Sequence, residues 1–162
     1  MIRRFLHRYG FGIQSPWAYS LVRDVLFESL RYYAFDDLRH KHPHLSRKER
    51  KRNEQLFRIV NHFKPSDIIT AGNCPPATLD YLLQKGTEGT LLLYYFGPES
   101  SKETIPTSIP DDAVVVIDDI SRSNQTLWEQ LLQNPQATAV FEMGYRGMMV
   151  FDPKRIRQTY QL

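Results

Sequence analysis

One run of residues restricts the fold of this chain more than any other, the sequence Ala-Val-Val-Val-Ile at positions 113–117. Side chains that branch at Cβ pack well on a pleated surface, so the run favours a β-strand. It contains no polar residue in alternation, which predicts a strand that is covered on both faces. Strands of this kind are typical of α/β proteins, whose helices lie on both faces of a largely parallel sheet.

The rest of the pattern agrees with an α/β fold. Apolar runs predict strands at 67–71 and 90–96, and residues 137–143 and 147–151 predict an antiparallel hairpin. Apolar residues at helical spacing predict helices at 16–30, 46–62, 76–83 and 124–133. We therefore expect a sheet of about five strands, with Ile68–Ala71 at its centre and the hairpin at one edge.

Charge is distributed unequally along the chain. Residues 1–64 carry 14 Lys and Arg against six Asp and Glu, whereas residues 65–162 carry seven against 12. We expect a basic helical segment, residues 1–64, that packs on an α/β core formed by residues 65–162, in one structural domain overall. The cluster of cations from Arg47 to Arg52 allows one function, an adaptor that binds anions or nucleic acid, although charge runs of this kind usually face water.

Three features indicate the cellular compartment. The longest apolar runs, Leu91–Phe96 and Ala113–Ile117, are far shorter than the roughly 20 residues of a membrane-spanning helix. The charged start of the chain is not followed by an apolar stretch, so we expect no secretory leader. Cys74 is the one cysteine, which excludes an internal disulfide and fits a reducing compartment. These features predict a cytoplasmic protein that does not enter a membrane.

Several segments resemble the class I S-adenosylmethionine-dependent methyltransferases, and among them a bacterial O-methyltransferase-like branch. The resemblance rests on residues Arg8–Tyr19, Tyr32–Leu38, Leu56–Pro65, Val116–Ile120 and Arg146–Phe151. It implies a Rossmann-like sheet of the methyltransferase type, here reduced in size and preceded by an N-terminal helical cap. It also implies that the chain, if active, transfers a methyl group from S-adenosylmethionine.

The turn that would hold this cofactor departs from the family's pattern. The family has an acid, then Gly-x-x-x-Gly and a Ser or Thr, where this chain has Thr-Ala-Gly-Asn-Cys-Pro-Pro-Ala-Thr at positions 70–78. Gly72 and Thr78 match the pattern, but Thr70 replaces the acid and Pro76 replaces the second glycine. Threonine has no charge and proline has no amide donor, so the turn has lost groups that would bind the cofactor.

The second strand carries the next expected cofactor contact. In the family an acid after this strand accepts hydrogen bonds from the ribose, and Glu99 is the candidate in this chain. The vestigial cofactor-binding residues are therefore Thr70, Gly72, Asn73, Thr78 and Glu99. Only the residues from Gly97 to Asp112 separate the second strand from the third, too few for the strand–helix units that the family has there.

Asp118 and Asp119 directly follow the apolar strand 113–117. Two adjacent carboxylates at the carboxyl end of a buried strand suggest a site for Mg²⁺ or Ca²⁺, and the resemblance implies metal ligands at this position. The alternative is structural, with Asp119 or Ser121 capping the next helix and Asp118 bonding to amides of the turn. The alternative is favoured, because the family's partner acid belongs to the segment that this chain lacks, and two carboxylates without a third convergent ligand make a weak magnesium site.

These departures from the family's cofactor-binding pattern lead to one leading hypothesis and two alternatives. The leading hypothesis is a methyltransferase-like protein without catalysis and without a bound cofactor, which acts as a binding or interaction module. Its partner is then a second copy of the chain or another protein, while nucleic acid and membranes are disfavoured. The alternatives are an active but divergent S-adenosylmethionine-dependent methyltransferase, and the anion- or nucleic-acid-binding adaptor.

Overall fold

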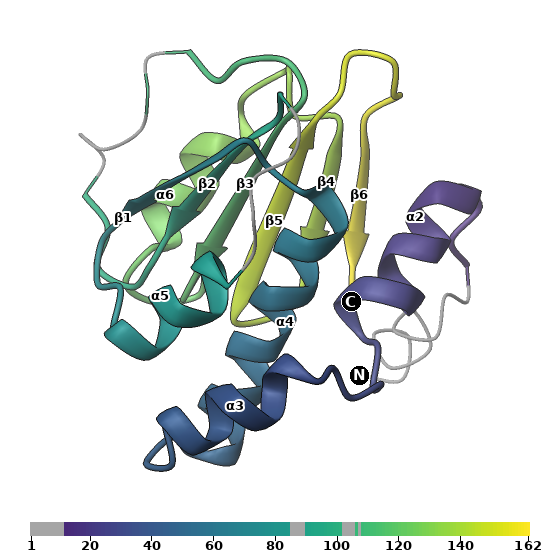
Figure 1. Cartoon of the computed structure of the whole chain (residues 1–162). Helices are drawn as coiled ribbons and strands as arrows, with labels where there is room; N and C mark the ends of the chain where they lie inside the picture. The colour runs from purple at the N-terminus through teal and green to yellow at the C-terminus, as the bar shows by residue number, and fades with distance from the viewer. Residues whose placement is uncertain (1–11, 85–89, 102–105, 107) are drawn as a thin grey trace. The chain divides into compact units, whose positions relative to one another are not determined.

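The computed structural model describes residues 12–84, 90–101, 106 and 108–162, and the chain divides into two compact units (Figure 1). The helical unit comprises Met1–Lys64 and Pro75–Gly86, and the sheet unit comprises Pro65–Cys74 and Thr87–Leu162. Among the described helices, none combines the length and the apolar character that crossing a bilayer requires.

The helical unit contains α2 (Pro16–Leu21), the π-helix η1 (Val22–Leu26), α3 (Ala34–Lys41), α4 (Arg47–Phe63) and α5 (Pro76–Leu83). The predicted helix 16–30 is wrong in its extent, because the chain leaves the α-helical hydrogen-bond pattern after Leu21. The amide of Phe27 then donates to the carbonyl of Val22, five residues earlier, and the helix ends. The helix α3 lies in a stretch where we expected no helix.

The helix α4 begins with the capping box that its sequence indicates. The amide of Glu49 donates to the Ser46 hydroxyl, while the amide of Ser46 donates to the Glu49 carboxylate. The Glu49 carboxyl has a lowered pKa because of its bonds to Ser46. Buried rings of three helices form the core of this unit, with Phe35, Phe57 and Tyr81 in one cluster.

The sheet unit is built on six strands with one helix, α6 (Gln125–Leu132). The strands are β1 (Asp67–Ala71), β2 (Leu92–Phe96), β3 (Ala113–Asp118), β4 (Ala139–Glu142), β5 (Arg146–Phe151) and β6 (Gln158–Gln161). They lie in the order β1-β2-β3-β5-β4-β6. β1, β2 and β3 are parallel, β5 is antiparallel to both β3 and β4, and β6 is parallel to β4.

This order corrects two expectations. The sheet has six strands instead of about five, because the polar segment Gln158–Gln161 extends the sheet beyond β4. The strand β1 lies at the edge and not at the centre, and the order of a Rossmann sheet is not observed. Periodicity marks β1 as a strand, but it contains no information on which strands become its neighbours. The antiparallel pairing of β4 with β5 is confirmed.

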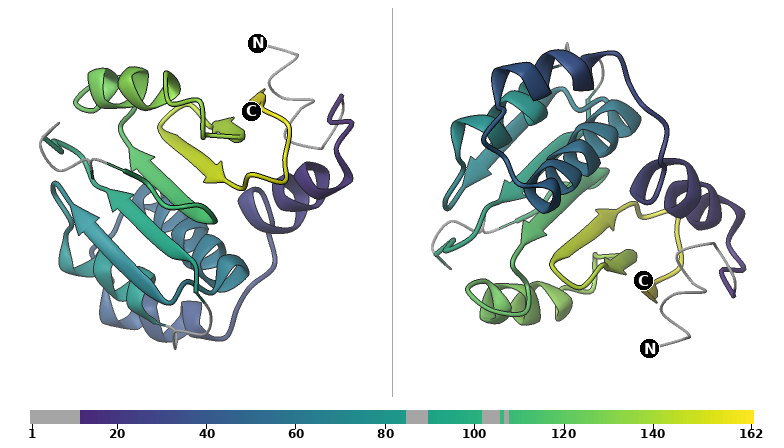
Figure 2. Two further views of the ribbon diagram at one scale, coloured as in Figure 1. Left: turned by 90° about the horizontal axis from the view of Figure 1, so that it is seen from above. Right: turned by 90° about the horizontal axis from the view of Figure 1, so that it is seen from below.

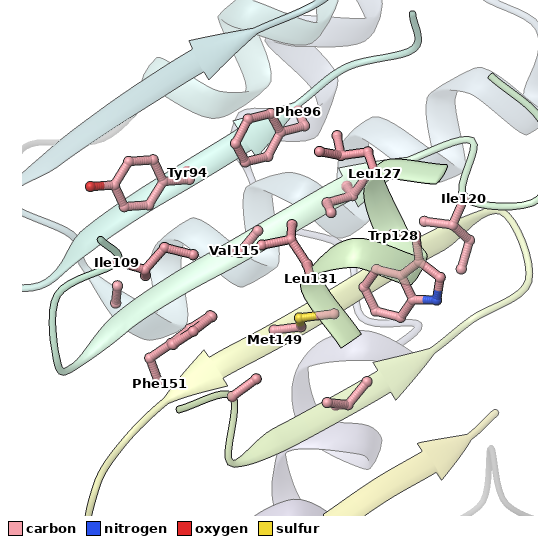
Figure 3. Packing of buried hydrophobic residues seen from close by; sticks show 14 residues of the cluster. Tyr94, Phe96, Ile109, Val115, Ile120, Leu127, Trp128, Leu131, Met149 and Phe151 are labelled. Atoms are coloured by element: carbon pink, nitrogen blue, oxygen red, sulfur yellow. The ribbon is translucent and has the colours of Figure 1, made fainter. Parts of the chain in front are cut away.

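The core of the sheet unit lies between one face of the sheet and α6 (Figure 2). The helix contributes Leu127, Trp128 and Leu131, which pack with residues such as Val115 and Met149 (Figure 3). Every residue of β3 is buried, as its apolar run predicts. A Cβ atom at Gly147 would lie 2.4 Å from the Trp128 ring, so the ring packs directly against the backbone of β5.

Candidate functional site

The carboxyl ends of β1, β2 and β3 lie side by side in the sheet unit, since these strands are parallel neighbours. The turns that follow them are Gly72–Cys74, Gly97–Ser100 and Asp119–Asn124. Ligands of open α/β sheets bind outside these ends of the strands, so this edge is where the sequence placed its candidate site.

The space beside Gly72 is filled by the turn that follows β2. A Cβ atom at Gly72 would lie 2.2 Å from the Ser100 hydroxyl oxygen and 2.7 Å from the carbonyl oxygen of Gly97. Gly72 has a φ of +75°, which is why this position favours glycine. The glycine that resembles the family's first cofactor glycine therefore packs against the chain's own backbone.

Backbone hydrogen bonds join the same two turns. The amide of Asn73 donates to the carbonyl of Pro98 at 2.7 Å, and the amide of Gly97 donates to the carbonyl of Ala71 at 2.8 Å. Gly97 has no space for a side chain, because its Cβ would lie 2.2 Å from the carbonyl oxygen of Asn73. The two turns are therefore so close that neither Gly72 nor Gly97 has space for a side chain.

Asn124 links these turns to the end of β3, although nothing in the sequence singled it out. Its side chain is fully buried and donates to the carbonyls of Gly97 and Asp118, at 2.7 and 2.8 Å. Its side-chain oxygen accepts from the amide of Ser100 at 3.0 Å. Asparagine is common at the start of a helix, and Asn124 directly precedes α6. This position suggests a capping residue, but it does not reveal the bonds to the two turns.

Asp118 is buried and forms an ion pair with Arg146. The two residues lie opposite each other on β3 and β5, and Arg146 donates to both carboxylate oxygens at 2.5 and 2.9 Å. The Tyr95 hydroxyl donates to the Asp118 carboxylate at 3.0 Å. Burial and the charge of Asp118 raise the pKa of Tyr95 well above its usual value, so this phenol stays protonated.

Asp119 has different partners from Asp118. It adopts a φ of +56°, and its carboxylate accepts from the amide and the hydroxyl of Ser123, at 3.2 and 2.8 Å. The structural alternative expected Asp119 or Ser121 to cap the next helix and Asp118 to bond to turn amides; in the structure it is Asp119 that bonds to the turn, and Asp118 pairs with Arg146. Among the described residues, no three His, Cys, Asp or Glu side chains converge on a common point that could hold a metal ion. A metal role for Asp118 and Asp119 stays a prediction.

The other candidate cofactor residues are dispersed. Thr70 is exposed on β1, and Glu99 is exposed in the turn after β2, where its amide donates to the Ser123 hydroxyl. Thr78 belongs to α5 of the helical unit, and its hydroxyl donates to the Asn53 side chain at 3.3 Å. Only Gly72, Asn73 and Glu99 therefore lie in the two turns whose contact forms the closed edge, and all three are exposed to solvent.

The strand order also bears on a cofactor site. Nucleotides bind open α/β sheets at the point where the order of the strands reverses direction. Here β2 follows β1 and β3 follows β2 in one direction, so no reversal lies among these three parallel strands; among the described strands the order turns back at β5, which lies between β3 and β4. The crevice that a reversal opens at the carboxyl edge is therefore not expected between β1, β2 and β3.

A buried histidine and the basic residues at the start of α4 lie in the helical unit. His42 is buried and contacts the Asp80 carboxylate of α5 at 2.6 Å, which gives this histidine a structural role. The side chains of Arg47, Lys48 and Lys51 are exposed on α4. Their exposure agrees with a solvated basic face, and binding of an anionic partner stays a prediction.

Cys74, at the end of the first turn, donates its thiol hydrogen to the carbonyl of Ala71 at 3.4 Å. Burial raises the pKa of this thiol, which lowers the fraction of reactive thiolate at neutral pH.

The chain matches no protein-family model, no curated protein and no solved structure. The α/β fold with its six-stranded mixed sheet therefore stands on the structure alone.

Proposed function

We propose that this chain is a methyltransferase-like protein that catalyses no methyl transfer and functions as an interaction module for another protein molecule. The observation that carries the proposal is the close packing at Gly72, where the Ser100 hydroxyl and the Gly97 carbonyl occupy the position that a Cβ atom would take. The sequence resemblance supplies the methyltransferase ancestry, and the loss of the acid at Thr70 points in the same direction.

Opening this edge for a ligand would break the contacts between the turns. Four bonds hold them besides the strand ladder: Asn73 to Pro98, Asn124 to Gly97, Ser100 to Asn124, and Glu99 to Ser123. At about 1 kcal/mol net for each bond, opening costs about 4 kcal/mol, which weakens the apparent affinity of any ligand roughly 1,000-fold. A cofactor that bound with micromolar affinity to an open edge would then require roughly 1 mM or more.

Calorimetric titration of the full chain with S-adenosylhomocysteine tests the proposal. We expect no saturable heat up to roughly 1 mM ligand, because the edge is closed and Pro75 and Pro76 provide no amide donors. An active S-adenosylmethionine-dependent methyltransferase, titrated under the same conditions, is the positive control. Saturable binding with a dissociation constant in the low micromolar range would refute the proposal and favour the divergent enzyme.

A further inference from the structure

The edge strand β1 is less covered than a parallel strand usually is. Ile69 is 43% exposed, and Asp67 and Thr70 are exposed as well. Among the described residues, β2 is the only strand that pairs with β1. An edge that combines free backbone groups with an exposed isoleucine is a template for pairing with another chain.

Ile69 is also the end of an apolar row that crosses the whole sheet. The strand registers place side by side Ile69, Tyr94, Val115, Met149, Val140 and Thr159. The four central residues of the row belong to the buried core. At the β6 edge the row ends in a polar threonine, but at the β1 edge it ends in an apolar side chain that is exposed to solvent. The β1 edge is therefore the end of the row at which an apolar side chain is left exposed.

Two residues of β1 direct their backbone amides and carbonyls away from the sheet. The Gly97 amide donates to the carbonyl of Ala71, so Ala71, and with it Ile69, direct their backbone groups toward β2, while before the strand the Ser66 amide donates to the carbonyl of Leu91. The amides and carbonyls of Ile68 and Thr70 consequently point away from the sheet. In agreement, the Ile68 amide donates to the carboxylate of Asp67 at 2.8 Å and not to β2.

We propose that two copies of this chain pair antiparallel along β1, about a two-fold axis at Ile69. Ile68 of each copy then lies opposite Thr70 of the other, and these two residues exchange backbone hydrogen bonds, four in total for the two pairs. The two Ile69 side chains face each other at the axis, in the position where antiparallel side chains are closest. This inference deepens the proposed function and rests on it, since it names the partner of the interaction module.

The five residues of β1 fit a second copy of themselves. The donors and acceptors of Ile68 and Thr70 are complementary under the two-fold operation, as an isologous interface requires. Asp67 lies opposite Ala71, so the two Asp67 carboxylates are at opposite ends of the pairing and like charges do not face each other. The Asp67 carboxylate has to release the Ile68 amide on pairing. The β6 edge, Gln-Thr-Tyr-Gln, offers no exposed aliphatic side chain for such a contact.

Sedimentation equilibrium of the full chain over a wide concentration range tests the inference. We expect a monomer–dimer equilibrium with a dissociation constant of roughly 1–100 µM, because an interface of one strand pair falls below about 1,200 Å². Thr70→Pro removes two of the four hydrogen bonds and is expected to weaken the dimer roughly tenfold or more. The variant keeps the ladder to β2, because the amide of Thr70 points outward, where an edge strand tolerates proline.

A matched control lies on the opposite edge. The amides of Gln158 and Leu162 donate to β4, so Thr159 directs its amide outward on β6 as Thr70 does on β1. Thr159→Pro is expected to leave the dimerisation constant unchanged. A second variant, Ile69→Lys, places two like charges at the axis and is expected to give a monomer that retains the far-ultraviolet circular dichroism of the native chain.

The outcomes separate this inference from the proposed function. A chain that stays monomeric at all concentrations, a dimer that Thr70→Pro leaves unchanged, or a dimer that Thr159→Pro weakens equally would overturn the β1 pairing. None of these results bears on cofactor binding, which the calorimetric titration measures separately. Conversely, a dimer that depends on Thr70 and also binds S-adenosylhomocysteine at micromolar concentration would contradict the non-catalytic function alone.

Discussion

Asp118→Asn is expected to lower the free energy of unfolding of the sheet unit by about 3–5 kcal/mol, because it removes the carboxylate charge that faces the buried guanidinium of Arg146. Arg146 is 2% exposed, and the Asp118 carboxylate accepts from two of its nitrogen atoms. The asparagine side chain has almost the same shape as aspartate, so the effect reports the lost charge and not a cavity. Urea unfolding followed by tryptophan fluorescence measures it through Trp128, which lies in the same core.

Asp119→Asn is the matched control, since it makes the same chemical change one residue further along. Asp119 is only partly buried and pairs with Ser123 instead of an arginine, so the expected loss is below about 1 kcal/mol. Asparagine also tolerates the left-handed backbone that Asp119 adopts. Equal losses for the two variants would contradict the structural role of Asp118, and with it the assignment of the buried ion pair.

Gly72→Ala is expected to cost about 2–5 kcal/mol of unfolding free energy, from two causes that add. The left-handed backbone of Gly72 imposes about 1–2 kcal/mol on any residue with a Cβ atom. The new methyl group would also meet the Ser100 hydroxyl and the backbone carbonyls of Gly97 and Pro98, and overpacking of this kind costs about 1–3 kcal/mol. Thermal or urea unfolding of the variant measures the sum.

Gly144→Ala separates the two causes. Gly144 has a φ of +82°, close to the +75° of Gly72, but nothing lies within 4 Å of the position of its Cβ. It is therefore expected to show the backbone cost alone, about 1–2 kcal/mol. If Gly72→Ala is no more destabilising than Gly144→Ala, then the turn after β2 does not fill the space beside Gly72, and the closed edge is refuted.

Local sequence patterns were sufficient for most elements of the fold, but they missed α3 and β6. The valine run of β3 required a strand with all residues buried, and the Ser46–Glu49 capping box placed the start of α4. Strand order could not be predicted in this way, because β1 has the composition of a central strand and lies at an edge. Order depends on which apolar faces fit together, and that is a property of contacts distant in the sequence.

In the candidate site, too, local patterns could be predicted from the sequence and distant contacts could not. The sequence located Gly72, Glu99 and Asp118 at the carboxyl ends of strands, but it could not reveal what surrounds them. The expected hairpin of residues 137–143 and 147–151 left Arg146 in the turn between its strands, and only the register of β3 with β5 places Arg146 opposite Asp118. Asn124 likewise has no pattern of its own, because its three bonds reach groups 6 to 27 residues away.

Amide hydrogen exchange at Asn73 and Gly97 tests the closed carboxyl edge most directly. Both amides donate to carbonyls across the two turns, so they are expected to exchange at least about 100-fold more slowly than amides of an unstructured chain. Their rates are expected to stay unchanged when S-adenosylhomocysteine is added in millimolar excess. Rates typical of an open turn, or a marked slowing caused by the ligand, would show an edge that opens to bind the cofactor and would contradict the account.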